Sequence, residues 1–231
     1  MANLRQWAVR FALILPTALL ILLSALPAFS LTLEEVIDRL QASYQKVEDF
    51  SGRFHQVSTL KSLGQTQEAG GLVYMKRPGK MRWEYKVPEA RLVVSDGQTL
   101  WIYTPESKQV IIQDVSTAFS SEVPLGFLTG KGNIRADFDV KFSTRTGTNK
   151  QGFYLLDLYP KRPDATLGKV SLEVNPKTFL VDKATVYDVY ANTTAIAIKG
   201  MRLNVGLADS KFTFEPPPGA EVLKSPLMPG K

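Results

Sequence analysis

Residues 80–87 read Lys-Met-Arg-Trp-Glu-Tyr-Lys-Val, and this stretch indicates the fold more clearly than any other part of the chain. Large apolar side chains occupy every second position, and charged side chains occupy the positions between them. Because successive side chains of a strand point to opposite faces, this alternation predicts a β-strand with one face in a core and the other in water. Residues 137–142, Asp-Phe-Asp-Val-Lys-Phe, repeat the pattern.

Similar short runs continue from Phe54 towards the end of the chain, and turn-forming pairs separate them. Asp96-Gly97 is a hairpin signal, and Asn175-Pro176 marks another turn. Further strands are predicted at about 70–77, 91–95, 99–104, 109–113, 152–159, 168–174, 179–188, 194–199, 201–205 and 211–214. About eleven short strands joined by hairpins predict a mainly β protein whose antiparallel sheet curls into a barrel or half-barrel.

One helix is predicted before the sheet, over Leu33–Val47. Thr32 followed three residues later by Glu35 is a capping box, which satisfies free N–H groups at a helix start. Apolar side chains then recur at helical spacing, at Leu33, Val36, Ile37, Leu40 and Tyr44. The polar side mixes both charge signs, so packing against the sheet is favoured over lying on a membrane surface.

Residues 1–30 have the three parts of a secretory signal peptide. Two arginines precede an apolar run over 11–23, and residues 28–30, Ala-Phe-Ser, supply the small residues that a signal peptidase requires. We expect cleavage after Ser30, which leaves 31–231 as a single domain in the periplasm. The alternative is an uncleaved membrane anchor, because the apolar run approaches the length of a spanning helix.

The composition excludes several classes of protein. With no cysteine, the chain forms no disulfide, binds no zinc through thiolates and carries no lipid on a cysteine of its own. The formal net charge is +6, but the basic residues are scattered along the chain. Scattered charge is typical of a solvated surface and does not favour nucleic-acid binding.

No catalytic or metal-binding constellation stands out. His55 is the one histidine of the chain, so a pair of histidine ligands cannot form. The sequence has no Gly-x-Ser-x-Gly elbow and no glycine-rich phosphate loop. We therefore expect a protein that is not an enzyme and that uses no cofactor and no metal, although a pair of acidic residues needs no sequence motif.

A binding protein remains the best interpretation. Seven large apolar side chains of the central strands are expected to line a groove: Met81, Trp83, Tyr85, Leu92, Val94, Leu100 and Ile102. Residues 114–132 break the strand rhythm with an apolar insert, which is expected to plug or cover that groove. The alternative is that these side chains only fill their own core. An apolar groove under a movable cover would accept an acyl chain.

Several motifs resemble the outer-membrane lipoprotein carrier protein family of the Lol system. They are Lys76-Arg77-Pro78, Arg82-Trp83-Glu84-Tyr85, residues 94–105 (Val-Ser-Asp-Gly-Gln-Thr-Leu-Trp-Ile-Tyr-Thr-Pro) and residues 211–219 (Lys-Phe-Thr-Phe-Glu-Pro-Pro-Pro-Gly). The resemblance is strong over 50–113 and 211–222 and weak between them. It rests on the order and spacing of the motifs together.

The resemblance implies an unclosed antiparallel half-barrel with a short helical lid over an apolar cavity. The lid corresponds to residues 114–132, with Phe119, Phe127 and Leu128 as its apolar contacts. The arginine of the Lys-Arg-Pro motif, Arg77, would hold the lid shut through hydrogen bonds to lid carbonyls. At Met81 the sequence departs from the family, which has a phenylalanine there.

The resemblance also implies partners. A monomeric carrier would take lipoproteins from an inner-membrane ABC-type releasing complex and hand them to an outer-membrane receptor. Two other functions remain open on the same fold. One is a carrier of free lipid or glycolipid, and the other is a lipid-sensor or regulatory module that carries nothing. Residues 216–231 are expected to form a C-terminal coil.

Overall fold

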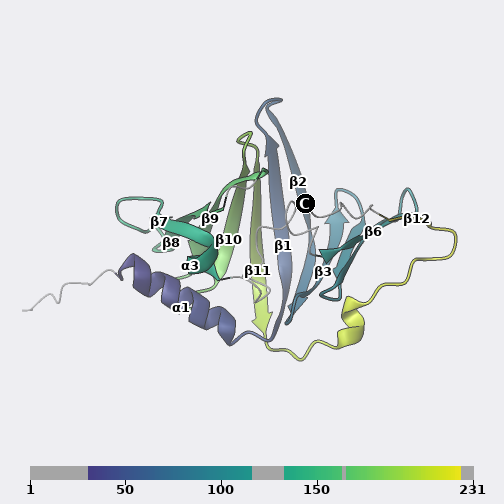
Figure 1. Ribbon diagram of the computed structural model, residues 1–231, viewed down its shortest axis with the longest axis horizontal. Helices are drawn as coiled ribbons and strands as arrows, with labels where there is room; N and C mark the ends of the chain where they lie inside the picture. Colours follow the sequence, from purple (N-terminus) through teal and green to yellow (C-terminus); the bar gives the residue numbers. More distant parts are fainter. Residues whose placement is uncertain (1–30, 116–132, 163–164, 225–231) are drawn as a thin grey trace, which may run out of the picture. The chain divides into compact units, whose positions relative to one another are not determined.

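The computed structural model describes residues 31–115, 133–162 and 165–224 of the protein, so the predicted signal peptide over 1–30 lies outside the described residues. Twelve strands form one sheet in these ranges, in the order β12-β6-β5-β4-β3-β2-β1-β11-β10-β9-β8-β7 (Figure 1). The strands are β1 (Asp49–Leu60), β2 (Gln65–Lys76), β3 (Lys80–Val87), β4 (Arg91–Ser95), β5 (Thr99–Thr104), β6 (Gln109–Asp114), β7 (Phe138–Phe142), β8 (Tyr154–Pro160), β9 (Leu167–Val174), β10 (Val181–Asp188), β11 (Thr193–Leu203) and β12 (Glu221–Lys224).

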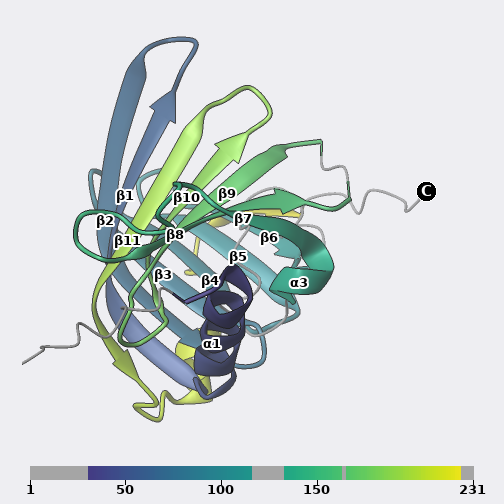
Figure 2. The same ribbon diagram turned by 90° about the vertical axis from the view of Figure 1, so that its left-hand side faces the viewer.

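The sheet is unclosed, because β12 and β7 lie at its two edges and do not pair with each other. Strands β1 to β6 follow one another in one direction, and β11 to β7 follow one another in the other. Pairing of β1 with β11 joins the two series, and both pairings of β1 are antiparallel. A curved half-barrel results (Figure 2), which confirms the predicted fold class.

Helix α1 (Leu33–Gln45) begins as the sequence predicts. The Glu35 N–H donates to the Thr32 hydroxyl at 3.2 Å, and the Thr32 N–H donates to the Glu35 carboxylate at 2.8 Å. Both halves of the capping box are therefore formed. The helix buries Val36, Ile37, Leu40 and Tyr44. It lies on the side of the sheet where β7 to β10 are found (Figure 1).

We call the face of the sheet that packs on α1 the concave face. Paired strands place their side chains on the same face as their partners, and the pairing of Phe54 with Ile198 and of Leu156 with Leu172 extends this face across both series of strands. These four side chains belong to one buried cluster together with the apolar side of α1. The concave face is thus the main core.

The opposite, convex face is covered in part by the chain that follows β11. A short 3-10 helix, η2 (Asp209–Phe212), lies there, and the Asp209 carboxylate bonds to the ammonium groups of Lys76 at 2.7 Å and Lys80 at 2.8 Å. Phe214 contacts Tyr103 at 5.6 Å between ring centroids. A strand was predicted at 211–214, and that prediction is wrong because these aromatic residues cross the face of the sheet and do not pair with an edge.

The prediction of a coil over 216–231 is also corrected in part. Residues Glu221–Lys224 form β12, which pairs in parallel with β6, so the sheet is not wholly antiparallel. Every side chain of β12 is exposed, and the segment has no alternation that could identify it as a strand. The pairing is explained by the free backbone groups of β6, which would otherwise be an unprotected edge.

Candidate functional site

Five of the seven predicted groove residues lie together on the concave face. They are Met81, Trp83, Tyr85, Leu100 and Ile102. The register explains this, because Trp83 pairs with Val93, and Val93 pairs with Ile102. Met81, Trp83 and Leu100 are buried, whereas Tyr85 and Ile102 are only half-buried. The part of this face over β3 to β5 therefore has a packed floor and a partly open apolar surface.

The structure corrects the prediction for Leu92 and Val94, which lie on the convex face. Leu92 pairs with Glu84, and Val94 pairs with Arg82, whose charged side chains point away from the core. Val94 is nevertheless 0% exposed, as is Phe212 of η2, because the chain after β11 covers this part of the convex face. Three consecutive apolar residues form the middle of β4, so alternation alone cannot assign their faces.

Val93 takes the place that was predicted for its neighbours. It lies between its pairing partners Trp83 and Ile102 and packs against the main core. Its side chain is half-buried. We call Tyr85, Val93 and Ile102 the open apolar patch. The sequence gives no signal for Val93 by itself. Its face follows only from the pairing of β4 with β3, whose alternation is unambiguous.

Phe54 of β1 holds the aromatic side of the patch in place. Its ring meets Trp83 edge-on at 4.9 Å and Tyr85 edge-on at 4.8 Å between centroids. Such edge-to-face contacts favour one arrangement of the rings and stabilise it beyond simple burial. Phe54 was expected only as the start of the sheet, and the motifs of the sequence do not reveal its place beneath the patch.

Polar groups border the patch beyond Tyr85. The Tyr85 hydroxyl donates to the Gln56 side-chain oxygen at 3.1 Å, and the Gln56 amide donates to the Ser58 hydroxyl at 3.1 Å. The Arg91 guanidinium lies 4.3 Å from the centre of the Tyr85 ring. The site thus combines an apolar floor with a hydrogen-bonding rim, an arrangement that suits a ligand with an apolar chain and a polar head.

Helix α1 occupies the other part of the concave face. The Tyr44 hydroxyl accepts a hydrogen bond from the Val181 N–H of β10 at 3.1 Å. Burial raises the pKa of Tyr44 well above its usual range, so the group stays neutral at any physiological pH. Arg135 of the short helix α3 (Ile134–Asp137) forms an ion pair with Asp38 at 2.7 Å, which ties the two helices together. This part of the face is closed.

Arg77 binds α1 in the described part of the structure. Its guanidinium donates to the Gln45 carbonyl at the end of the helix at 3.1 Å, and its backbone N–H donates to the Glu48 backbone carbonyl at 2.8 Å. A carbonyl acceptor was expected, but on the lid. The predicted lid residues Phe119, Phe127 and Leu128 lie outside the described residues, so the latch stays a prediction.

Val115, inside the predicted lid, and Ile134, just beyond it, are both anchored in the main core. Val115, just after β6, is buried, and its N–H donates to the Gln98 carbonyl at 2.8 Å. Ile134, in the first turn of α3, is also buried. Both belong to the cluster on the concave face. Val115 and Ile134 therefore lie on the same face as the open apolar patch.

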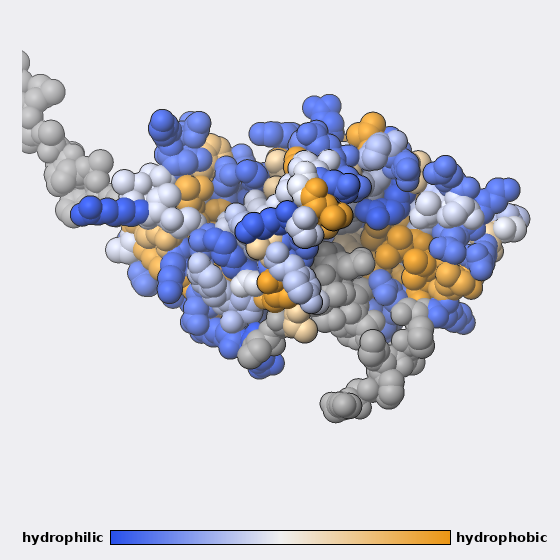
Figure 3. Space-filling view, turned by 90° about the horizontal axis from the view of Figure 1, so that it is seen from above, coloured by the Kyte–Doolittle hydropathy of each residue, from blue (hydrophilic) through white to orange (hydrophobic). Residues whose placement is uncertain are grey.

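Seen from above, apolar side chains gather on the side of the protein where β3 to β6 lie (Figure 3). Within the described ranges, no helix is long and apolar enough to span a membrane. The same ranges hold no group of three or more side chains that could bind a metal ion.

Known proteins resemble this chain over most of its length. The family model described as "Outer membrane lipoprotein carrier protein LolA" matches residues 45–215. An outer-membrane lipoprotein carrier protein of Chromobacterium violaceum is 31% identical over 81% of this chain and 86% of its own. That of Bordetella avium is 31% identical over 88% of this chain and 93% of its own.

Among solved structures, an uncharacterized conserved protein of Thermus thermophilus shares the fold with a TM-score of 0.53. It is 12% identical and covers 83% of this chain and 98% of its own. A structural match at 12% sequence identity is evidence for the fold only.

Proposed function

The chain belongs to the outer membrane lipoprotein carrier protein LolA family, and on that premise we propose that it binds the acyl chains of lipoproteins on the open apolar patch and carries them through the periplasm. The observation that carries this proposal is the patch itself. Tyr85, Val93 and Ile102 share one face, lie outside the part of it that α1 closes and remain half-buried.

Apolar burial supplies the binding energy. Each methylene group that an acyl chain removes from water contributes about 0.8 kcal/mol when it is fully buried. A patch that is already half-buried supplies only part of that sum, so cargo is held without becoming irreversibly bound. Such moderate binding suits a protein that must release its cargo to a receptor.

We further propose the partners that such a carrier needs. An inner-membrane ABC-type complex releases the lipoprotein to the carrier, and an outer-membrane receptor accepts it. A lipid-anchored receptor would require a cysteine, which this chain lacks, so the chain fits the part of the carrier. We also propose that the predicted lid, residues 114–132, covers the bound chains, which the burial of Val115 and Ile134 on the concave face supports.

The test is release of a lipoprotein from spheroplasts into the medium by added protein 31–231. Wild-type protein is expected to bring the lipoprotein out of the membrane as a soluble complex. Ile102→Glu places a charge on the patch and is expected to abolish release. Leu92→Glu is the matched control, because it places the same charge on the convex face from an equally half-buried position of a neighbouring strand.

Failure of wild-type protein to release lipoprotein, with the inner-membrane complex active, would contradict the carrier function. Extraction of free phospholipid in its place would favour a lipid carrier. Binding of neither would favour a regulatory module. Equal release by both variants would leave the carrier function standing but remove the patch from it.

A further inference from the structure

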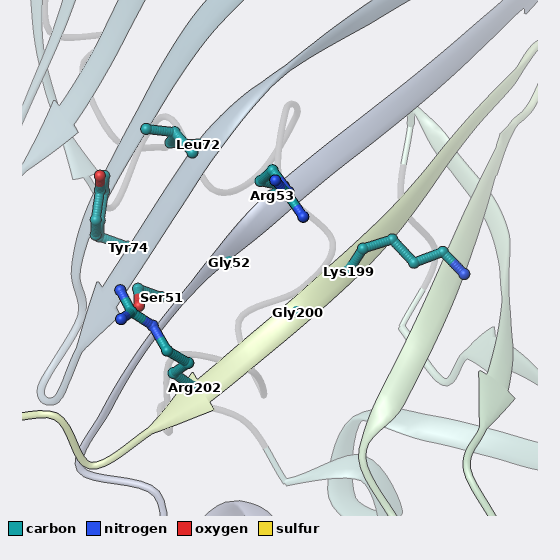
Figure 4. A pocket seen from close by; sticks show the side chains of 8 residues that line it. All are labelled: Ser51, Gly52, Arg53, Leu72, Tyr74, Lys199, Gly200 and Arg202. Atoms are coloured by element: carbon teal, nitrogen blue, oxygen red, sulfur yellow. The ribbon is translucent and has the colours of Figure 1, made fainter.

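A hollow lies on the convex face where β2, β1 and β11 meet (Figure 4), whereas the open apolar patch lies on the concave face. Its volume is about 270 Å³. The residues that line it are Ser51, Gly52, Arg53, Leu72, Tyr74, Lys199, Gly200 and Arg202. Nothing in the carrier function calls for a basic hollow at this place.

A β-bulge creates the hollow. Ser51 pairs with Arg202 and Arg53 pairs with Lys199, so one residue of β1 stands opposite two residues of β11. Gly200 is the additional residue, and its φ of 62° is one that glycine adopts without strain. Because Gly200 has no side chain, the surface is empty between the two basic side chains of β11. Bulges of this kind often re-aim side chains at binding sites.

Two arginines face the hollow without an acidic partner. Arg53 and Arg202 form no ion pair in the described part of the chain. Neighbouring basic groups on the same face are neutralised, since Arg82 pairs with Glu84 at 2.7 Å and Lys76 pairs with Asp209 at 2.7 Å. The positive charge of the hollow is therefore uncompensated.

Lys199 adds charge from the edge of the hollow. Its side chain extends away from Arg53 and Arg202 (Figure 4). Burial raises the pKa of the nearby Asp182, and the positive charge of Lys199 lowers it in part. The basic core of the hollow is thus the pair of arginines.

The side chain of Ser51, in β1, lines the hollow and carries an unpaired hydroxyl. Ser51 is only 4% exposed, and its hydroxyl oxygen is fully buried without a hydrogen-bond partner in the described structure. A buried polar atom without a partner costs free energy, so it is uncommon unless a ligand or water completes it. Ser51 and Arg202 are register partners, which places this hydroxyl beside a free guanidinium.

We propose that this hollow is a binding site for a phosphate-class oxyanion, either the head group of an anionic phospholipid or free phosphate. Guanidinium groups match phosphate oxygens with paired N–H donors. Arg53, Arg202 and Tyr74 come from three adjacent strands, which suits a tetrahedral group with several acceptor oxygens. The Ser51 hydroxyl donates to the same group and gains the partner it lacks.

The experiment measures binding of two probes at low salt, because exposed charge interactions are screened as salt rises. Inorganic phosphate is titrated by calorimetry, and vesicles of phosphatidylcholine with and without phosphatidylglycerol are used in flotation. The double variant Arg53→Gln/Arg202→Gln is expected to weaken binding by at least about tenfold. Arg145→Gln/Lys150→Gln removes the same charge from an exposed turn and is expected to bind as wild type.

Ser51→Ala separates a binding role from a structural one. It is expected to weaken phosphate binding while leaving the free energy of unfolding unchanged or higher, because the unpaired hydroxyl is removed.

Binding of phosphate that is lost only in the arginine variant would support a site for the free anion. Binding only of phosphatidylglycerol vesicles, with the same loss, would support a head-group site. The proposal is overturned if wild-type protein binds neither probe, or if both double variants behave alike.

Discussion

The two parts of the concave face contrast sharply. Over β8 to β10, α1 closes the face, and Leu40 of the helix and Leu172 of the sheet are essentially without exposure. Over β3 to β5 no described helix covers the face, and Val93 and Ile102 stay half-buried. One part of the sheet thus stabilises the fold, and the other keeps an apolar surface available. The same curved sheet can do both because α1 covers only one end of it.

The largest expected difference between the two parts is in stability. Leu40→Ala removes a side chain that is 0% exposed and is expected to lower the free energy of unfolding by about 2–5 kcal/mol. Ile102→Ala removes a half-buried side chain and is expected to cost about 1–2 kcal/mol. Urea unfolding followed by circular dichroism measures both. Equal losses would mean that the patch is ordinary core.

A second prediction concerns Asp49, which holds the chain after β11 against the convex face. The Asp49 carboxylate accepts hydrogen bonds from the N–H groups of Val205, Gly206 and Leu207 at 2.7–3.0 Å, which directs the chain onto the convex face. Asp49→Ala leaves these donors unpaired and is expected to cost about 2–3 kcal/mol. Asp49→Asn keeps an acceptor and should lose less. The same unfolding experiment compares the two variants. If Asp49→Ala unfolds with the same free energy as the wild type, these hydrogen bonds do not stabilise the fold.

Arg77 links the two parts, because it connects the end of β2 with the last carbonyl of α1. Arg77→Leu is expected to cost at least about 1 kcal/mol of stability, the usual contribution of a single hydrogen bond. It is expected to impair lipoprotein transfer more than this small loss explains. Arg77→Lys keeps the positive charge but lacks the planar guanidinium group. It serves as the control that separates the effect of charge from that of hydrogen-bond geometry. Unchanged transfer by the leucine variant would remove Arg77 from the carrier mechanism.

The smallest effect is expected at Asp209, where pH is the variable. Hydrogen bonds from Lys76 and Lys80 lower the pKa of this exposed carboxyl to about 2 from its ordinary 3.8. Because the folded-state pKa is the lower one, the contact is present above pH 3.8 and is lost as the pH falls to about 2. The protection of the backbone amides over 207–214 against hydrogen exchange, measured relative to their intrinsic exchange rates, should therefore fall in this window. Asp209→Asn should lower that protection already at neutral pH, and a wild-type pH dependence of the protection in this variant would contradict the assignment.

The sequence predicts the parts of the fold that have a single interpretation. The alternation of β3 identifies a strand and its faces, and Thr32 with Glu35 identifies the start of α1. The faces of the apolar residues 92–94 could not be assigned, because three consecutive apolar residues show no alternation and the face of each depends on the pairing of β4 with β3. The strand β12 has no pattern of its own and exists because β6 offers an edge. The hollow at Gly200 depends on a register shift that only the three-dimensional pairing reveals.

The most direct test of the acyl-binding patch compares two neighbouring residues that face opposite ways. Leu92 and Val93 are both half-buried, but Val93 lies on the concave face and Leu92 on the convex face. A photo-crosslinking amino acid is placed at each position in turn, and the protein is illuminated with bound lipoprotein. Crosslinks to the lipoprotein acyl chains from position 93 and not from position 92 are predicted. Equal crosslinking from both positions, or crosslinking from position 92 alone, would contradict the account.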